Sequence, residues 1–281
     1  MSLEVTQLAR QQLDNMDDPK SLLAENTITV ISDCGFADQS QFLEWCSSFA
    51  EPSKFAYTKT DFEAVSTINY SKNQTVIYPQ AGTRWNGHPQ GDWHQDVVFA
   101  DPRPQFTVLY ANLAVPQHGA TWFADTHQAY CDLSAGYKKL LQNLEIIHYR
   151  QPNKRYTQRN WEQEYLDNNL EKLSIKDLNN LKVWFETAFQ QTQRPVLAKD
   201  TAGNTCIYLS PSKAVQFADW TEEESRPLID FLAVHMTRPE YIYQHQWQNG
   251  QAVIWSNNRY LHYGVYDYQG YDRELWRCHL I

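Results

Sequence analysis

The hydrophobic and polar positions of the chain predict a protein built mainly from β-strands. Short runs either alternate between apolar and polar residues or are rich in β-branched and aromatic residues, which is typical of strands. These runs cover residues 27–31, 105–116, 205–209, 241–247, 252–255 and 274–281. Within 105–116, we expect Phe106, Val108, Tyr110 and Leu113 to be buried.

Helical periodicity is confined to a few segments. The first 20 or so residues have the pattern of a polar helix, and Asp17-Asp18-Pro19 predicts the start of a second, short one. Residues 39–49 carry apolar side chains at spacings of three and four. A further helix is expected from Thr221 to about Met236, because three acidic residues follow Thr221 and suit a helix N-terminus.

The long segment between the second and third strand runs breaks the β pattern. Residues 124–193 are mainly helical in their periodicity, over 127–144 and again over 170–192. Residues 70–92 are rich in Gly, Pro, Asn and Gln, which indicates a loop. We therefore predict one domain over 1–281, a mainly β double-stranded β-helix (a cupin-like jelly roll) with an α-helical insert at about 124–193.

Composition and charge restrict the classes of function. The 281 residues carry a formal net charge of −9, which argues against nucleic-acid binding, since phosphate contacts need a basic surface. The sequence contains no run of 18 apolar residues, so it predicts no membrane span, and residues 1–5 do not resemble a signal peptide. Five cysteines without CxxC spacing indicate free thiols and a cytoplasmic location.

The most informative local pattern is His94-Gln95-Asp96, with His262 far along the chain. In an extended strand His94 and Asp96 project to one side while Gln95 points away. Two histidines and one carboxylate occupy one face of an Fe(II) octahedron and leave the other face open for a co-substrate and dioxygen. A third ligand from a distant strand, His262, would complete this set.

Three segments resemble the taurine dioxygenase-like (TauD/TfdA) family of Fe(II)/2-oxoglutarate oxygenases. Residues 93–99, Trp-His-Gln-Asp-Val-Val-Phe, resemble its W-H-x-D-x-x-F signature, and residues 253–262 resemble its V-I-W-D-N-R-x-x-x-H segment. Gly119-Ala120-Thr121 lies where the family has G-D-T. The likeness runs in order over roughly residues 90–281. Ser256 and Asn258 stand where the family has Asp and Arg, so the contacts that support His262 can differ from those in the family.

The resemblance implies roles for individual residues. His94, Asp96 and His262 would bind iron, and Arg273 and Thr121 would hold the far carboxylate of 2-oxoglutarate, which a guanidinium meets with two parallel hydrogen bonds. The alternatives are a surface ion pair for Arg273 and a purely structural hydroxyl for Thr121.

Three further interpretations concern residues around these positions. Arg277 lies on the same strand face as Arg273 and would contact either an anionic substrate or the co-substrate. Asn257 is expected to support the metal strand. The remaining histidines, including His279, are interpreted as structural or surface residues.

The expected activity is oxidation, above all hydroxylation, of a C–H bond in a small anionic organic molecule, with release of succinate and CO2. Desaturation, cyclisation and oxidative decarboxylation remain alternative outcomes of the same site. A cupin-like protein without turnover and a zinc hydrolase are the rival classes, and the second leaves Arg273 unexplained. Relatives often assemble as homo-oligomers, so the resemblance leaves a homo-oligomer open.

Overall fold

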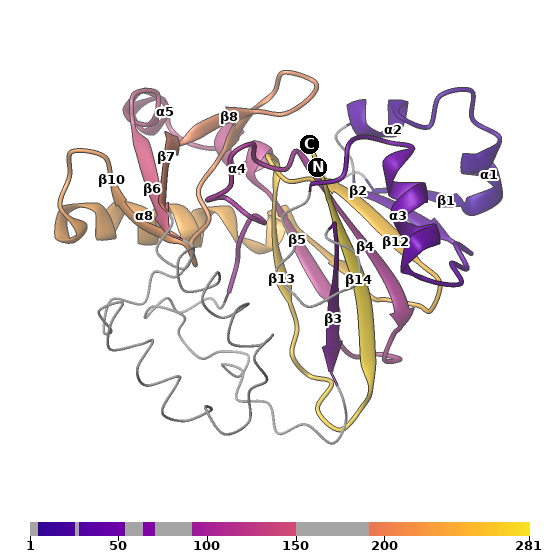
Figure 1. Cartoon of the computed structure of the whole chain (residues 1–281). Helices are drawn as coiled ribbons and strands as arrows, with labels where there is room; N and C mark the ends of the chain where they lie inside the picture. The colour runs from indigo at the N-terminus through magenta and orange to yellow at the C-terminus, as the bar shows by residue number, and fades with distance from the viewer. Residues whose placement is uncertain (1–4, 26–27, 54–63, 71–91, 150–190) are drawn as a thin grey trace, which may run out of the picture.

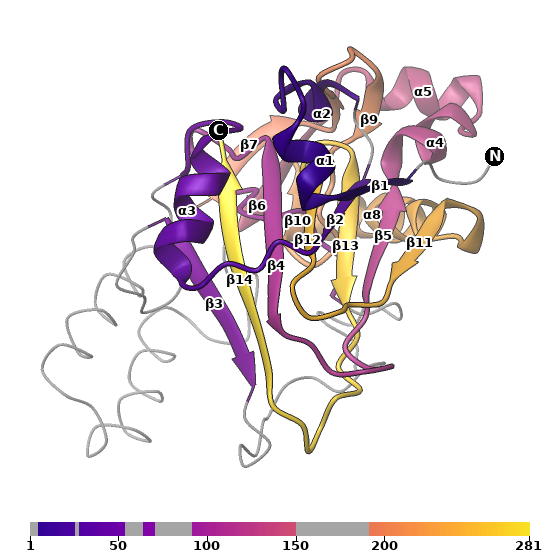
Figure 2. The same ribbon diagram turned by 90° about the vertical axis from the view of Figure 1, so that its right-hand side faces the viewer.

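In the computed structural model, two β-sheets pack face to face and enclose an apolar interior (Figure 1). The structure describes residues 5–25, 28–53, 64–70, 92–149 and 191–281. The larger sheet has six strands in the order β1-β2-β12-β4-β14-β3, and among these only β1 and β2 pair in parallel. Their bounds are β1 Val5–Ala9, β2 Ile28–Ser32, β3 Val65–Tyr70, β4 Phe106–Leu113, β12 Ala252–Ser256 and β14 Arg273–Leu280. Figure 2 shows β3, β14 and β4 side by side.

The smaller sheet contains three antiparallel strands in the order β11-β5-β13. They are β5 (Thr121–Asp125), β11 (Ile242–His245) and β13 (Tyr260–Gly264). Phe123 and Tyr260 from this sheet pack with Trp255 and Leu275 from the larger one, and all four are buried. These contacts between the inner faces identify the fold as a jelly roll of two facing sheets, as the sequence predicts.

Alternation along β14 explains why both faces of the larger sheet are buried. Leu275 points into the interior, whereas Trp276, Cys278 and Leu280 pack on the outer face against Phe42 and other residues of the N-terminal helices. These helices are α1 (Arg10–Asp14), α2 (Ser21–Ala24) and α3 (Gln39–Ser47). The Asp38 side chain caps α3 by accepting from the backbone N–H of Gln41.

A second helical layer covers the outer face of the smaller sheet. It contains α4 (Thr126–Cys131) and the long α8 (Glu222–Met236), whose apolar sides share one buried cluster with Leu261. Thr221 and Glu224 form a capping box, which confirms the predicted start of α8. The remaining elements of this half are α5 Ala135–Leu141, β6 Glu145–Tyr149, β7 Gln191–Pro195, β8 Leu197–Lys199, β9 Thr205–Ile207, β10 Ala214–Phe217 and the 3-10 turn η2 Pro239–Tyr241.

Most predicted strands are confirmed, but the N-terminus is not a single helix. Residues 5–9 form β1, which pairs with β2, and only α1 is helical within residues 5–20. The backbone pairing offered by β2 outweighs the weak helical pattern. Leu113 is also wrong as a buried position, because it is 39% exposed at the end of β4.

The helical interpretation of residues 124–193 is wrong at both ends of that segment. Ala124 and Asp125 belong to β5, and β6 pairs antiparallel with β7. The short helices α4 and α5 are confirmed between them. Alternate residues of β6, Ile146 and His148, are buried, and this period of two went unrecognised beside the helices. Residues 150–190, and with them most of the predicted 170–192 helix, lie outside the described residues, as does most of the 70–92 loop.

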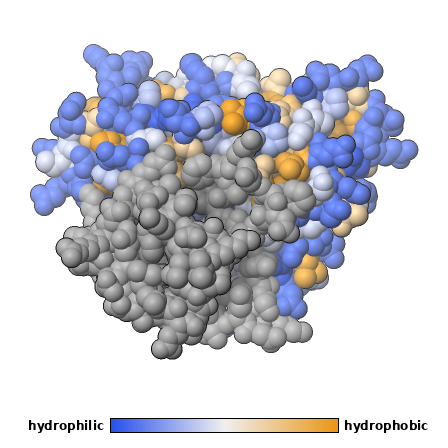
Figure 3. Space-filling model, viewed as in Figure 1, coloured by the Kyte–Doolittle hydropathy of each residue, from blue (hydrophilic) through white to orange (hydrophobic). Residues whose placement is uncertain are grey.

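The surface of the described residues is mainly hydrophilic on the face seen in Figure 3, where apolar residues are scattered and form no single large patch. Of the helices that the structure describes, none has the length and hydropathy needed to cross a membrane.

Candidate metal centre

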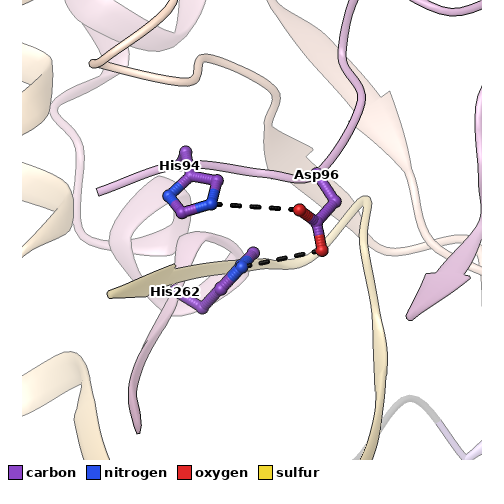
Figure 4. A group of neighbouring side chains, drawn as sticks. All are labelled: His94, Asp96 and His262. Atoms are coloured by element: carbon purple, nitrogen blue, oxygen red, sulfur yellow. Dashed lines mark ion pairs between the residues drawn. The ribbon is translucent and has the colours of Figure 1, made fainter. Parts of the chain in front are cut away.

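The structure brings His94, Asp96 and His262 together at the inner side of the smaller sheet. Their ligand atoms all lie within 4.8 Å of one another (Figure 4). His94 Nε2 lies 3.9 Å from Asp96 Oδ1, and His262 Nε2 lies 3.6 Å from Asp96 Oδ2. Residues separated by more than 160 positions therefore present two imidazole nitrogens and one carboxylate to a common space.

Backbone hydrogen bonds hold the two histidines side by side. The N–H of His94 donates to the carbonyl of His262 at 3.0 Å, and the N–H of His262 donates back at 2.8 Å. Their rings lie 4.2 Å apart between centroids. The His94 Nδ1 atom is 2.7 Å from the carbonyl oxygen of Asp92, so Nδ1 carries the proton and Nε2 keeps its lone pair. That tautomer leaves Nε2 ready to bind a metal.

The environment keeps His262 and Asp96 in the protonation states that metal binding requires. Burial and the neighbouring His94 lower the pKa of His262 to about 3, so its imidazole is neutral at pH 7. Burial raises the pKa of Asp96, but the positive charge of Arg277 and the contacts with His262 and His279 lower it more, so the net pKa lies well below its usual range. Two imidazoles and one carboxylate form a donor set that fits Fe(II).

Asn257 supports the segment that carries Asp96, as the sequence predicts, although this segment is a turn and not a strand. Its Oδ1 accepts from the backbone N–H of Asp96 at 2.8 Å, and its Nδ2 donates to the Asp96 carbonyl at 2.7 Å. The neighbouring Asn258, which departs from the family pattern, instead donates to the Gln105 side chain and the Lys199 carbonyl. The departure therefore changes a peripheral contact and leaves the support of Asp96 in place.

Arg277 contacts the metal-binding carboxylate. Its Nη1 lies 3.0 Å from Asp96 Oδ1, and its Nε donates to Ser66 Oγ at 3.2 Å. The side chain is 15% exposed. It offsets the charge of Asp96, a contact that the sequence did not predict.

Arg273 lies on the same face of β14, but its surroundings differ. It is buried, and its Nη2 donates to the Gly119 carbonyl at 3.1 Å while Tyr268 stacks on the guanidinium at 4.8 Å. Among the described residues no carboxylate forms an ion pair with it, and burial lowers its pKa. A Cβ on Gly119 would lie 2.7 Å from Arg273 Nε, so the glycine is needed for this close approach.

Thr121 is buried at the start of β5, two residues after Gly119. Its Oγ1 accepts a hydrogen bond from Trp247 Nε1 at 2.9 Å. The hydroxyl hydrogen therefore remains available to donate to another group. Trp247 was not recognised from the sequence, since nothing in its local pattern separates it from a core residue.

The sequence interpretation also missed two residues beside Asp96. His279 is buried with Nε2 3.3 Å from Asp96 Oδ2, and Thr107 Oγ1 donates to the same oxygen at 3.2 Å. His279 is thus a neighbour of the metal triad and not a remote structural residue. Its position two residues beyond Arg277 carried the signal, because alternation along a strand places both on one face.

Comparison with known proteins finds a matching family model and similar sequences. The family model described as "Taurine catabolism dioxygenase TauD, TfdA family" matches residues 3–279. An alkylsulfatase from Acinetobacter baylyi is 30% identical over 202 residues, which cover 72% of this chain and 58% of that protein. An alpha-ketoglutarate-dependent 2,4-dichlorophenoxyacetate dioxygenase from Burkholderia sp. is 25% identical over 246 residues, covering 81% of this chain and 72% of the relative.

The fold has solved counterparts. A taurine dioxygenase from Burkholderia xenovorans superimposes with a TM-score of 0.68 over 96% of this chain and 81% of that one, at 21% sequence identity. At this identity the similarity establishes the fold, and it confirms the jelly roll predicted from the sequence.

Proposed function

Because the chain belongs to the TauD/TfdA family of Fe(II)- and 2-oxoglutarate-dependent dioxygenases, we propose that it hydroxylates a C–H bond of a small anionic organic substrate. Succinate and CO2 are the products formed from the co-substrate. The observation that carries this proposal is the convergence of His94, Asp96 and His262 within reach of one metal ion. A cupin without turnover would leave unexplained why Arg273 and Arg277, both on one strand, accompany the three ligands.

His94, Asp96 and His262 would hold the iron. Their donor atoms fit it, since imidazole and carboxylate are the ligands that non-haem Fe(II) takes with positions left open. Bound iron, together with 2-oxoglutarate and dioxygen, supplies the oxidising power for C–H cleavage. The protein contributes the placement of the ligands through Asn257 and the β13 backbone.

Arg273 and Thr121 would bind the far carboxylate of 2-oxoglutarate. A buried guanidinium without a carboxylate partner among the described residues is costly, and an anionic ligand would offset that cost. Thr121 adds a hydroxyl donor, because its oxygen already accepts a hydrogen bond from Trp247. Tyr268 and Gly119 fix the guanidinium in place, so its two donor edges are oriented before the ligand arrives.

Arg277 would recognise the anionic group of the substrate. Its contact with Asp96 places the guanidinium beside the metal site, and 15% exposure leaves part of it accessible. The relatives support an anionic substrate, since one is named an alkylsulfatase and the other acts on 2,4-dichlorophenoxyacetate, a carboxylate. Orientation of the co-substrate is the competing role for Arg277.

A cytoplasmic location is proposed because all five cysteines are free thiols.

The proposal is tested by anaerobic loading with Fe(II) and 2-oxoglutarate, followed by exposure to dioxygen in the presence of candidate substrates. The panel would contain alkyl sulfates, sulfonates and aryloxyacetates, with uncharged alcohols of the same carbon skeleton as controls. Succinate release coupled to a product that has gained one oxygen atom is the expected result. A product that has lost two hydrogens would indicate desaturation, and absence of succinate with every substrate and of 2-oxoglutarate binding would contradict the proposal.

A further inference from the structure

The carboxylate of Asp96 is contacted from two strands of the larger sheet. Thr107 on β4 and His279 on β14 are direct partners in the register of the two strands, and both side chains point at Asp96. Thr107 is completely buried, and His279 is 3% exposed. These two residues reach the same oxygen, Oδ2, at 3.2 and 3.3 Å.

The other oxygen of Asp96 has a different neighbour. Arg277 Nη1 lies 3.0 Å from Oδ1, and no contact from Thr107 or His279 to this oxygen is found within the described residues. A carboxylate oxygen has about two lone-pair directions. Thr107 and His279 both approach Oδ2, whereas Arg277 donates to Oδ1 and leaves one lone-pair direction of that oxygen for a metal.

The imidazole of His279 is suited to donate to a carboxylate. Its Nε2 atom is the ring nitrogen that faces Asp96, at 3.3 Å from Oδ2. A ring proton belongs on this nitrogen, since a lone pair aimed at a carboxylate oxygen would be repelled. An N–H donor on Oδ2 fixes the orientation of the carboxylate.

We propose that His279 is a positioning residue that acts with Thr107 to hold Oδ2, so that Asp96 binds iron through Oδ1 alone. A carboxylate is able to bind a metal through one oxygen or through both. Binding through both would occupy a position that the co-substrate or dioxygen requires. The inference rests on the proposed function, because it assumes that His94, Asp96 and His262 hold iron.

The experiment uses Co(II) as a spectroscopic substitute for Fe(II), because the intensity of its visible absorption changes with coordination number. The variants are His279→Leu, which removes the donor at similar volume, His279→Gln, which retains an N–H donor, and Thr107→Val, which removes only the hydroxyl. His235→Leu is the matched control, since His235 is also buried but contacts the Ala129 carbonyl on a remote helix. Folding is followed by circular dichroism and metal affinity by anaerobic titration with Co(II) and Fe(II).

His279→Leu is expected to weaken metal binding by about 10- to 100-fold, the range found when residues that orient a metal ligand are removed. Its Co(II) spectrum should change in intensity, with a smaller change in Thr107→Val. His279→Gln should restore most of the affinity and the wild-type spectrum, and His235→Leu should leave both unchanged. A residue that only filled space would not be rescued by the retained N–H donor.

A folded His279→Leu protein with wild-type affinity and a wild-type Co(II) spectrum would overturn the inference. Should His279→Leu fail to fold, Thr107→Val decides, and wild-type affinity and spectrum in that variant overturn the inference in the same way. Failure of the wild-type protein to bind either metal would instead overturn the proposed function. The two failures are therefore distinguishable.

Discussion

Arg273 and Arg277 lie four residues apart on the same face of one strand, yet their environments are opposite. Arg277 pairs with a carboxylate, Asp96, at 3.0 Å and is partly exposed. Arg273 is buried more deeply, donates to a backbone carbonyl and stacks on a tyrosine ring, while Asp267 acts on it without forming an ion pair. Arg277 therefore has a carboxylate in direct contact, whereas Arg273 has none among the described residues.

The difference shows which end of the site is complete within the chain. At the metal end, the protein supplies ligands, a counter-charge and oriented donors. At the Arg273 end, it supplies a rigid cation without an ion-pair partner among the described residues, which is unfavourable unless an anion binds. The alternation of side chains along a strand predicts that both arginines lie on one face. The sequence did not reveal that only Arg277 has a carboxylate in direct contact.

The largest expected effect comes from destroying the metal end. Asp96→Ala and His262→Ala should each abolish turnover, because the remaining donors cannot hold Fe(II) in the required geometry. Succinate formation and anaerobic Fe(II) titration measure the effect. Asp230→Ala, at an exposed ion pair on α8, serves as the control and should behave as wild type. Normal turnover in either triad variant would contradict the assignment.

Replacing Arg273 should have the next largest effect. Arg273→Lys keeps the charge but loses the paired donors, and Arg273→Ala loses both. Loss of such a charge-assisted contact costs about 2–3 kcal/mol, so the KM for 2-oxoglutarate should rise roughly 30- to 150-fold in Arg273→Ala. The KM for the primary substrate should change much less. An unchanged KM for 2-oxoglutarate would mean that Arg273 is not the co-substrate anchor.

Arg277→Ala tests the other half of the comparison. If Arg277 binds the anionic group of the substrate, substrate affinity should fall roughly tenfold in the variant, the effect of losing one hydrogen bond to a charged group. Iron and 2-oxoglutarate binding should persist, so 2-oxoglutarate should decay without product. Calorimetry with each ligand separates the two roles. Loss of 2-oxoglutarate binding with substrate affinity intact would assign Arg277 to the co-substrate.

A milder change at Gly119 should affect the Arg273 end alone. Gly119 has φ +66°, and a Cβ there would lie 2.7 Å from Arg273 Nε. Gly119→Ala should therefore displace the guanidinium and cost about 1–2 kcal/mol of backbone strain. We expect a several-fold rise in the KM for 2-oxoglutarate and unchanged Fe(II) affinity. Gly203→Ala, where φ is +83° and nothing lies near the added Cβ, controls for backbone strain.

Sequence reasoning located the triad because its signals are local: two ligands two residues apart and a third in a recognisable segment. The extended strand expected at His94 and Asp96 is wrong, because His94 forms only an isolated bridge with His262 and Asp96 begins a turn. Sequence reasoning also found β14, the strand that carries Arg273 and Arg277. It missed β1 and the β6–β7 pair, whose formation depends on partners distant in sequence. It placed Phe106, Val108 and Tyr110 in the core but overlooked Thr107, because β4 is buried on both faces and its polar alternate position faces the metal site.

The smallest effect concerns pH and the pairing of Arg277 with Asp96. Burial raises the pKa of Asp96, and Arg277 is the strongest of the influences that lower it to a net value well below normal. Arg277→Gln should raise this pKa, so protons compete with metal at higher pH.

The sign follows from linkage. A carboxyl whose folded pKa is lowered stabilises the fold above its unfolded pKa, and this contribution disappears as pH falls through the folded value. Arg277→Gln should therefore reduce the stability of the metal-free protein above pH ~4. It should also move the acid limit of Co(II) binding upward. His262 does not produce this shift, because its pKa of about 3 keeps it neutral in mild acid. Titrations from pH ~3 to ~7, which span the ordinary carboxyl range, measure the limit, with Arg226→Gln on α8 as the surface control. Superimposable profiles would show that Arg277 leaves the charge state of Asp96 unchanged, and the contrast between the two arginines would then rest on geometry alone.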